Sequence, residues 1–212
     1  MSTRTLASQL KDATRELHQV AERAGGMSAL LRGQVDRAQY CLLLRNFHVL
    51  YAALEAALDR HATMPLVAPV RMPVLYRTAA LASDLRVLHG AGWNELPVAA
   101  AMRSYVARVE EIARTQPPLL AAHAYVRYMG DLSGGQILRD VVRRSLDLQD
   151  DAGTAFYTFA GGADGREIRE RFRAALDALP LDDALAQAIV AEACDAFVRH
   201  VALFEELHRP PG

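Results

Sequence analysis

Three glycines beside two charged residues form the stretch of this sequence whose residue types could most readily do chemistry. Gly130, Gly134 and Gly135 fall within a pattern that is otherwise helical. Each helix-interior glycine costs about 1 kcal/mol relative to alanine, so the stretch needs compensation. Gly130 and Gly134 share one stripe, where the missing Cβ atoms let a flat molecule approach the backbone. Asp131 and Arg127 add charge at its edge, so the stretch predicts one wall of a site for a planar ligand.

Two other interpretations of the same stretch deserve comparison. The glycines are also consistent with a plain kink or a close helix contact, in which Arg127 and Asp131 would form a surface ion pair. Residues 132–136, Leu-Ser-Gly-Gly-Gln, match the signature pentapeptide of ABC-type ATPases. That chemistry needs a phosphate loop with a lysine after its last glycine. The only lysine, Lys11, follows no glycine, so the ATPase interpretation is excluded while the kink stays open.

His18 is the histidine best placed to bind a metal. It lies beside Leu17 at the edge of an apolar helical stripe, and Glu22 follows four residues later. An imidazole there can act as a single axial ligand while the carboxylate bonds its other nitrogen. A purely structural histidine–glutamate pair is the alternative. A ferritin-like di-iron site is excluded because it needs two Glu-x-x-His pairs, and only Glu205–His208 has that spacing. No Gly-x-Ser-x-Gly nucleophile elbow occurs either.

Helical periodicity covers most of the chain and supplies the elements that would position these residues. Gly25 and Gly26 are expected to end the first helix, and Asp36 to cap a long one. Three prolines make residues 64–73 an extended connection, and residues 149–165 read as a loop. No stretch alternates with period two, so the sequence predicts an all-α chain of seven or eight helices. The expected helices span residues 5–24, 36–58, 75–88, 97–114, 117–146, 165–179 and 181–209.

Composition narrows the function classes. The 212 residues are 51% hydrophobic and carry a formal charge of −1, which argues against nucleic acid as a partner. Cys41 and Cys194 lack metal-site spacing and are expected to be buried free thiols. With no signal peptide and no apolar run near the ~18 residues of a membrane span, we expect a soluble, cytoplasmic protein that has no membrane partner. A single domain should cover residues 1–212, with flexible ends at 1–4 and 209–212.

Two segments of the chain resemble a known family. Residues 127–136, Arg-Tyr-Met-Gly-Asp-Leu-Ser-Gly-Gly-Gln, and residues 10–22, Leu-Lys-Asp-Ala-Thr-Arg-Glu-Leu-His-x-x-Ala-Glu, closely resemble the haem oxygenases. The similarity extends in order over nearly the whole chain. The resemblance implies an all-α, single-domain haem-oxygenase-like bundle with a kinked, glycine-rich distal helix. It also implies a monooxygenase that uses O2 and a reductant to cleave haem to biliverdin, expected to be the α isomer, with release of Fe2+ and carbon monoxide.

The resemblance also implies roles for individual residues. Haem b would be both cofactor and substrate, held between the first helix and the glycine helix. His18 would bind the iron and Glu22 would tune it. Asp131 would hold distal waters that deliver a proton to bound O2. The other distal residues would be Gly130, Gly134, Arg127, Tyr51, Tyr105 and His200. The other residues expected to hold haem are Lys11, Arg15, Met27, Tyr125, Gly135, Arg169, Arg173 and Phe197.

One departure from the family pattern concerns His200, which stands where mammalian relatives have an asparagine. A titratable imidazole near Asp131 is expected to shift the pH at which the distal water is acidic. The mammalian membrane tail is also missing, which predicts a soluble, bacterial-type monomer. Its electron donor would be a ferredoxin or an NAD(P)H-dependent flavin reductase.

Two other functions stay open at this stage. A haem-binding carrier or storage protein would need His18 and the glycine wall but not the network around Asp131. A thiaminase-like, non-haem enzyme on the same helical scaffold would need a cysteine nucleophile or an acidic cluster in the bundle interior, and neither stands out.

Overall fold

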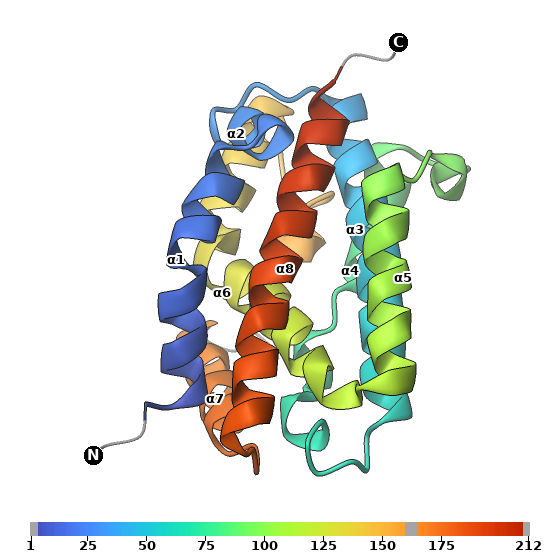
Figure 1. Ribbon diagram of the computed structural model, residues 1–212. Helices are drawn as coiled ribbons and strands as arrows, with labels where there is room; N and C mark the ends of the chain where they lie inside the picture. Colours follow the sequence, from blue (N-terminus) through green and yellow to red (C-terminus); the bar gives the residue numbers. More distant parts are fainter. Residues whose placement is uncertain (1–3, 160–164, 210–212) are drawn as a thin grey trace.

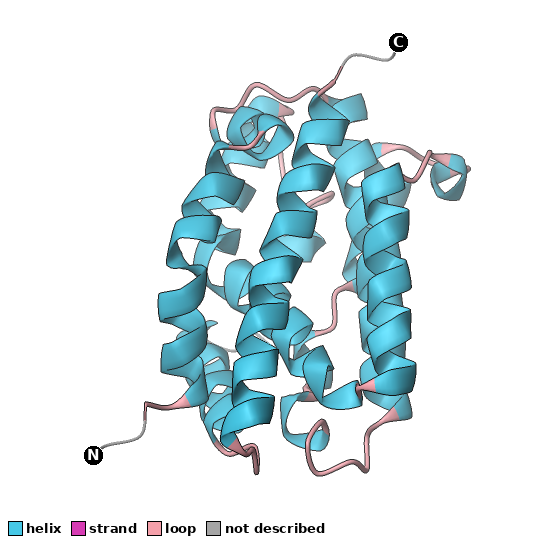
Figure 2. Cartoon of the chain, viewed as in Figure 1, coloured by secondary structure: helices cyan, strands magenta, loops and turns pink. Residues whose placement is uncertain are grey.

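The computed structural model describes residues 4–159 and 165–209. Within these ranges every regular element is helical and no strand occurs, so the predicted all-α class is confirmed (Figure 2). Most of the two predicted flexible ends lies outside the described residues. The α-helices are α1 (Leu6–Arg23), α2 (Gly25–Leu31), α3 (Arg37–Arg60), α4 (Thr78–Leu88), α5 (Ala100–Thr115), α6 (Leu120–Ser145), α7 (Gly165–Asp177) and α8 (Asp183–His208). Short 3-10 helices are η1 (Ala68–Val70), η2 (Pro73–Leu75), η3 (Trp93–Glu95), η4 (Pro117–Leu119) and η5 (Ala155–Tyr157).

Helix α8 lies in front between α1 and α5, and α6 crosses behind it (Figure 1). Both α1 and α6 pack against α8, while α3 packs against α4 and α5. Figure 1 shows α6 changing direction about half-way along its length, where the glycines fall. Glycine lowers the cost of such a bend because it lacks a Cβ atom. The upper half of α6 therefore faces α1 across the bundle.

Helix α3 forms the centre of the core. Asp36 caps it as the sequence predicts: its side chain accepts a hydrogen bond from the Gln39 amide, and the Gln39 side chain accepts one from the Asp36 amide. Contrary to the sequence analysis, residues 37–60 have the length and mean hydropathy, 1.3, of a membrane span. Of that apolar window 61% is buried inside the structure, as in a core helix.

The two glycines after α1 do more than end a helix. Helix α2 begins at Gly25, although the two glycines were expected only to end the first helix. A Cβ atom on Gly25 would lie only 2.6 Å from Cβ of His208 and 2.8 Å from the carbonyl oxygen of Phe204. Oε1 of Glu205 accepts a 3.0 Å hydrogen bond from the Gly25 amide. Glycine is therefore required because α2 rests directly on α8.

Two connections also differ from expectation. The proline-rich residues 64–73 are not simply extended, because Pro69 at the second position of η1 and Pro73 at the first position of η2 lie in short 3-10 turns. The predicted loop over residues 149–165 contains η5, in which Phe156 and Tyr157 are buried. Of the two cysteines, Cys41 is buried as expected, whereas Cys194 is partly exposed.

Candidate functional site

A cavity of about 600 Å³ opens between α1, α2, α6, α7 and α8, with η5 and Phe47 of α3 also lining it. This volume is within the usual range for small-molecule and cofactor pockets. Its lining brings together residues far apart in the sequence, from Ala7 on α1 to Phe204 on α8. The predicted site residues that line it are Lys11, His18, Glu22, Met27, Tyr125, Arg127, Gly130, Asp131, Gly134, Arg169, Arg173, Phe197 and His200.

The glycines of α6 face two different environments. A Cβ atom at Gly130 or Gly134 would meet no neighbouring atom within 4 Å, because both positions open onto the cavity. A Cβ atom on Gly135 would instead lie 3.7 Å from Cδ1 of Tyr157. Gly135, expected to contact the ligand, is therefore buried against η5 and does not line the cavity. The bare backbone facing the cavity belongs to Gly130 and Gly134.

His18 lies across the cavity from these glycines, on α1. Its Nδ1 is 3.6 Å from Oε1 of Glu22, as the i, i+4 spacing suggested, and about half of each side chain is exposed. The ring packs edge-on against Phe197, with centroids 5.9 Å apart. Nε2 has no hydrogen-bond partner among residues 4–159 and 165–209. This nitrogen is available as a single metal ligand.

Asp131 belongs to a buried polar network on the opposite wall. Its two oxygens accept hydrogen bonds from the Tyr51 hydroxyl and from Nη2 of Arg127, the latter at 3.2 Å. Arg127 also donates from Nε to the Tyr51 oxygen at 3.0 Å. The Arg127 and Asp131 side chains are only 11% and 7% exposed, so the surface ion pair considered from the sequence is wrong. The network fixes one carboxylate at the edge of the cavity.

Burial raises the pKa of Asp131 above its ordinary value, although Arg127 and the Tyr51 hydrogen bond oppose the shift. Burial also raises the pKa of Tyr51 well above 10. Asp131 is therefore easier to protonate than a solvated aspartate. A carboxyl group that takes up a proton more readily than a solvated one is suited to holding or releasing a proton at the edge of the cavity.

His200 contacts Arg127, not Asp131, in the structure. Nη1 of Arg127 lies 3.0 Å from Nε2 of His200, and Nδ1 of His200 lies 2.8 Å from the Ala196 carbonyl oxygen. Because the guanidinium can only donate, Nε2 must accept and Nδ1 must carry the hydrogen. Burial, followed by the Arg127 charge, lowers the pKa of His200 well below 6.5. The prediction of a titrating His200 is corrected: the ring is a neutral acceptor that holds Arg127.

Tyr105 belongs to a second buried network behind the first. Its hydroxyl lies 3.1 Å from Nδ1 of His123, whose Nε2 lies 3.1 Å from Oε1 of Glu192. Arg108 binds both carboxylate oxygens of Glu192, at 3.0 and 2.6 Å. Burial alone would raise the pKa of Glu192, but the hydrogen bonds from His123 and Arg108 outweigh burial and bring this pKa to about 2. Tyr105 does not line the cavity, and it contacts the first network through its ring, whose centroid lies 5.1 Å from that of His200.

Positive charge gathers at one end of the cavity. Lys11 on α1 and Arg169 and Arg173 on α7 line it, and none of the three has an ion-pair partner in the part of the chain that the structure describes. Burial raises the pKa of Tyr125, and the nearby Arg173 charge opposes this shift. Arg15 does not join this group, because its guanidinium pairs with Asp12 at 2.7 Å on the outer face of α1. These three cations can therefore bind an anionic group of a ligand.

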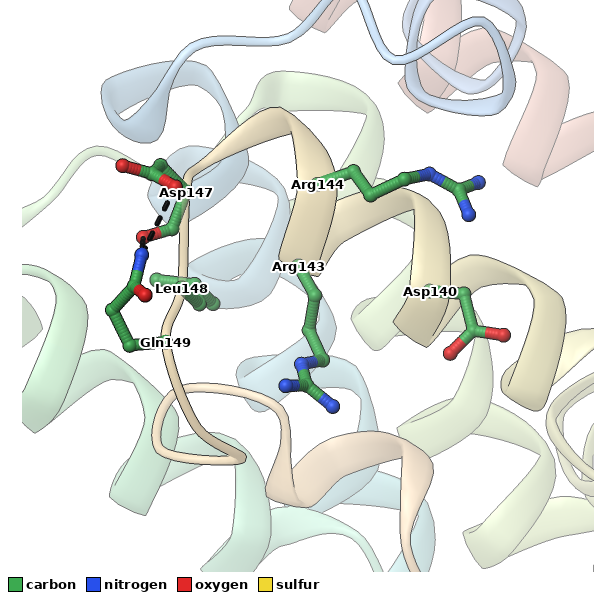
Figure 3. Close-up of a pocket in the computed structure, with 6 residues that line it drawn as sticks. All are labelled: Asp140, Arg143, Arg144, Asp147, Leu148 and Gln149. Atoms are coloured by element: carbon green, nitrogen blue, oxygen red, sulfur yellow. Dashed lines mark hydrogen bonds between the residues drawn. The ribbon is translucent and has the colours of Figure 1, made fainter.

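A second, shallower depression lies at the C-terminal end of α6. In Figure 3 the side chains of Arg143, Arg144 and Asp140 point in different directions. The Gln149 side chain donates to the backbone and side-chain oxygens of Asp147, at 3.3 and 3.0 Å. Without converging groups, this depression offers no site.

Comparison with known proteins decides the family. Residues 4–206 match the family described as "Heme oxygenase". The chain belongs to the haem oxygenase family. The sequence resemblance is thereby confirmed.

Relatives within this family support the same placement over the full length of the fold. Heme oxygenase 1 of Nostoc sp. is 39% identical over 203 residues, which cover 95% of this chain and 85% of the relative. The crystal structure of heme oxygenase-1 from Synechocystis sp., in complex with heme, aligns with a TM-score of 0.92, 39% identity and coverage of 96% and 92%. Heme oxygenase from Leptospira interrogans gives a TM-score of 0.92, 37% identity and coverage of 96% and 100%.

The cavity of this haem oxygenase family member fits an iron porphyrin by its own features. A flat ring needs the open space beside Gly130 and Gly134, an iron needs the unpaired nitrogen of His18, and carboxylates need cations at the rim. A bare metal ion has no comparable site, because no cluster of three or more His, Cys, Asp or Glu side chains occurs in the described ranges.

Several cavity residues escaped the sequence analysis. Phe156 and Tyr157 of η5 line the inner wall, although their segment read as a loop. The Phe47 ring centroid lies 4.5 Å from the guanidinium carbon of Arg127, which stacks over the ring. Its helical spacing had indicated only an ordinary core residue. The available signal was the aromatic cluster at residues 156–159, unusual in a solvated loop. His123 gave no signal beyond its helical position.

Proposed function

We propose that this protein binds haem b between α1 and α6 and, with O2 and a reductant, cleaves it to biliverdin, Fe2+ and carbon monoxide. The observation that carries the proposal is the buried Asp131 network, which opens onto the cavity beside the uncovered backbone of Gly130 and Gly134. A carrier would need the cavity and His18, but nothing in haem storage calls for a protonatable carboxyl group held on the distal side. Family membership supports the same activity.

His18 supplies Nε2 as the proximal iron ligand in this proposal. Glu22, near Nδ1, keeps the hydrogen on Nδ1 and leaves Nε2 free to donate its lone pair. Phe197 restricts the tilt of the ring. Haem, when bound, supplies both the iron that activates O2 and the porphyrin that is oxidised.

Asp131 acts as the proton-holding group on the distal side. Tyr51 and Arg127 orient both carboxylate oxygens, and His200 holds Arg127 in turn. The backbone of Gly130 and Gly134 would form the distal wall of the haem site and would restrict how O2 can lie there. Together these groups direct a proton and exclude bulk water from the distal space.

The cations at the rim set the orientation of haem. Lys11, Arg169 and Arg173 would bind the two propionates, and the apolar Met27 and Leu31 would receive the opposite edge. Cleavage at the α-meso carbon is the outcome we expect from this orientation. We also expect a monomer in the cytoplasm that takes electrons from a ferredoxin or a flavin-dependent reductase.

The proposal is tested with three variants in one assay. Protein, haem and reductant are combined in air, and the haem absorption band, bilin and carbon monoxide are measured. His18→Ala should weaken haem binding by about tenfold or more, because the iron loses its ligand. Asp131→Ala should still bind haem but lower bilin yield by about 10²-fold, the usual worth of a positioned proton donor.

Asp140→Ala, an exposed position on the same helix, is the matched control and should behave as the wild type. Haem that is bound tightly but never degraded by the wild type would favour the carrier. Normal bilin yield from Asp131→Ala would remove the proposed role of that carboxyl group.

A further inference from the structure

Two charged side chains at α4 bond the backbone of η5 and of the residue after it, one through amides and the other through carbonyl oxygens. Asp84 accepts hydrogen bonds from the amides of Ala155 and Phe156, one at each carboxylate oxygen and both at 2.8 Å. Arg77, the residue just before α4, donates from Nη1 to the carbonyl oxygens of Thr158 at 2.7 Å and Phe156 at 3.4 Å. Both side chains are almost fully buried, 1% and 3% exposed. Because they are seven residues apart, they lie on one side of the helix.

The segment they hold touches the distal wall of the cavity. Tyr157 packs behind α6, with its Cδ1 3.7 Å from a Cβ position on Gly135. Phe156 packs against the Tyr51 ring, with centroids 5.8 Å apart, and Tyr51 bonds Asp131. Helix α6 therefore contacts η5 at Gly135, next to the glycines that open onto the cavity. Any shift of η5 changes the support of both the glycine backbone and the Tyr51–Asp131 bond.

Arg77 has an electrostatic link to the same wall. Its charge favours the ionised form of Asp131, adding to the larger effect of Arg127. Within the described residues, Arg77 makes no salt bridge: its guanidinium donates to backbone carbonyl oxygens and stacks 4.1 Å from the Phe159 ring centroid, and only its backbone amide donates to a carboxylate, that of Glu55. The position of the Arg77 charge is therefore fixed by these hydrogen bonds and by the stacking on Phe159. A lysine could not bond the same set of carbonyl oxygens.

We propose that Asp84 and Arg77 are positioning residues for haem cleavage, which fix η5 and thereby set the height of α6 above haem and the alignment of Asp131. This rests on the proposed function. Neither residue lines the cavity or touches the ligand space. Their effect should be on where and how the distal groups act, more than on whether haem binds.

The hydrogen bonds by which Asp84 and Arg77 hold η5, called the clamp below, should respond to pH. Burial raises the pKa of Asp84 to about 6, against the two amide bonds, which favour the ionised form. A protonated carboxyl group accepts hydrogen bonds less strongly, so the hold on η5 weakens below about pH 6. The titratable groups facing Asp84 are Tyr40 from α3 and Tyr157 from η5. Burial raises the pKa of both phenols above 10, so neither changes charge between pH 5 and 8.

The test compares Asp84→Asn with the wild type in two measurements on the haem complex. The first is the absorption spectrum of the ferric complex from pH 5 to 8, and the second is the ratio of bilin isomers at pH 7.5. The wild-type spectrum should change with a midpoint near pH 6, and Asp84→Asn should lack that midpoint. The asparagine side chain has one acceptor oxygen, whereas the amides of Ala155 and Phe156 need two. The bilin isomer ratio of Asp84→Asn should therefore shift away from the wild-type value.

Asp59→Asn is the control, because within the described residues the carboxylate of Asp59, on α3, bonds only Arg71 and Tyr76 and makes no bond to η5. It should leave both readouts unchanged. Identical titrations and isomer ratios for Asp84→Asn and the wild type would overturn the inference. A wild type that fails to bind or degrade haem would instead overturn the proposed function.

A second measurement keeps the inference testable should Asp84→Asn fail to fold. In the wild type without haem, amide hydrogen exchange at Ala155 and Phe156, corrected for intrinsic pH dependence, should lose protection by about tenfold between pH 7.5 and 5.5, as a bond to a charged acceptor weakens. Protection that does not change over this range would contradict the clamp.

Discussion

Gly130 and Gly134 lack side chains where α6 faces the cavity, and these two positions allow a direct test of what the cavity holds. Gly134→Ala should stabilise the haem-free protein by about 1 kcal/mol, since alanine is the better helix former and its methyl group meets open space. The same methyl group should weaken haem binding by about tenfold, because overpacking costs about 1–3 kcal/mol. Urea unfolding and haem titration measure the two effects.

Gly135→Ala is the matched control one residue away. Its methyl group would make an ordinary 3.7 Å contact with Tyr157, so the stability gain should appear without the loss of haem affinity. Equal effects of the two substitutions on haem binding would show that haem does not lie against Gly134.

His200 allows a prediction about acid stability. Its pKa is lowered in the fold, so the unfolded chain binds the extra proton and stability should fall as pH drops below 6.5. His200→Gln keeps an acceptor for Arg127 but cannot be protonated. The stability of the wild type relative to this variant should therefore decrease by about 1.4 kcal/mol per pH unit below 6.5. Urea unfolding of the haem-free proteins from pH 7.5 to 5 measures this difference, and a constant value would contradict the buried neutral ring.

Sequence reasoning at this scale found most of the side chains but not all of their partners. The i, i+4 spacing correctly paired His18 with Glu22 and Arg127 with Asp131. It could not show that His200 bonds Arg127, because that contact joins residues 73 apart on two helices. The assigned roles of these residues stay predictions until the variants are measured.

At the scale of elements, one helix end depends on a neighbour. Helix α5 has no side-chain cap of its own, and Glu206 of α8 accepts hydrogen bonds from the amides of Ala100 and Ala101, both at 2.8 Å. Glu206→Ala should lower the free energy of unfolding by about 1 kcal/mol, the usual worth of an N-cap. Glu110→Ala, exposed on α5 itself, should change it little. Urea unfolding at pH 7 measures both, and equal effects would contradict the capping role.

Element boundaries were predictable where local chemistry decides them. The Asp36 cap and the helical register of α3 follow from adjacent residues. The start of α2 at Gly25 and the burial of η5 were not predictable, because each depends on distant contacts with α8 and α4 respectively. Asp84 looked like an ordinary polar residue in a helical pattern, and only the folded chain brings it to Ala155.

At the scale of the molecule, six α-helices and η5 contribute to one cavity with distinct ends and faces. Cations lie at the α1–α7 end, an unpaired imidazole nitrogen lies on α1, and a protonatable carboxyl group lies beside bare backbone on α6. The cost of glycine in α6, about 1 kcal/mol each, is understandable when a ligand binds against that backbone. The all-α fold and the family were predictable from the sequence. Helical periodicity covers most of the chain, and the resemblance to the family extends over nearly all of it.

The central claim is that this cavity consumes the porphyrin it binds. The most direct measurement is a single turnover: the equimolar haem complex is reduced in air, and carbon monoxide and bilin are counted per haem. The account predicts loss of the haem band with one carbon monoxide and one bilin for each haem. A haem band that persists through repeated reduction in air, without carbon monoxide, would contradict it.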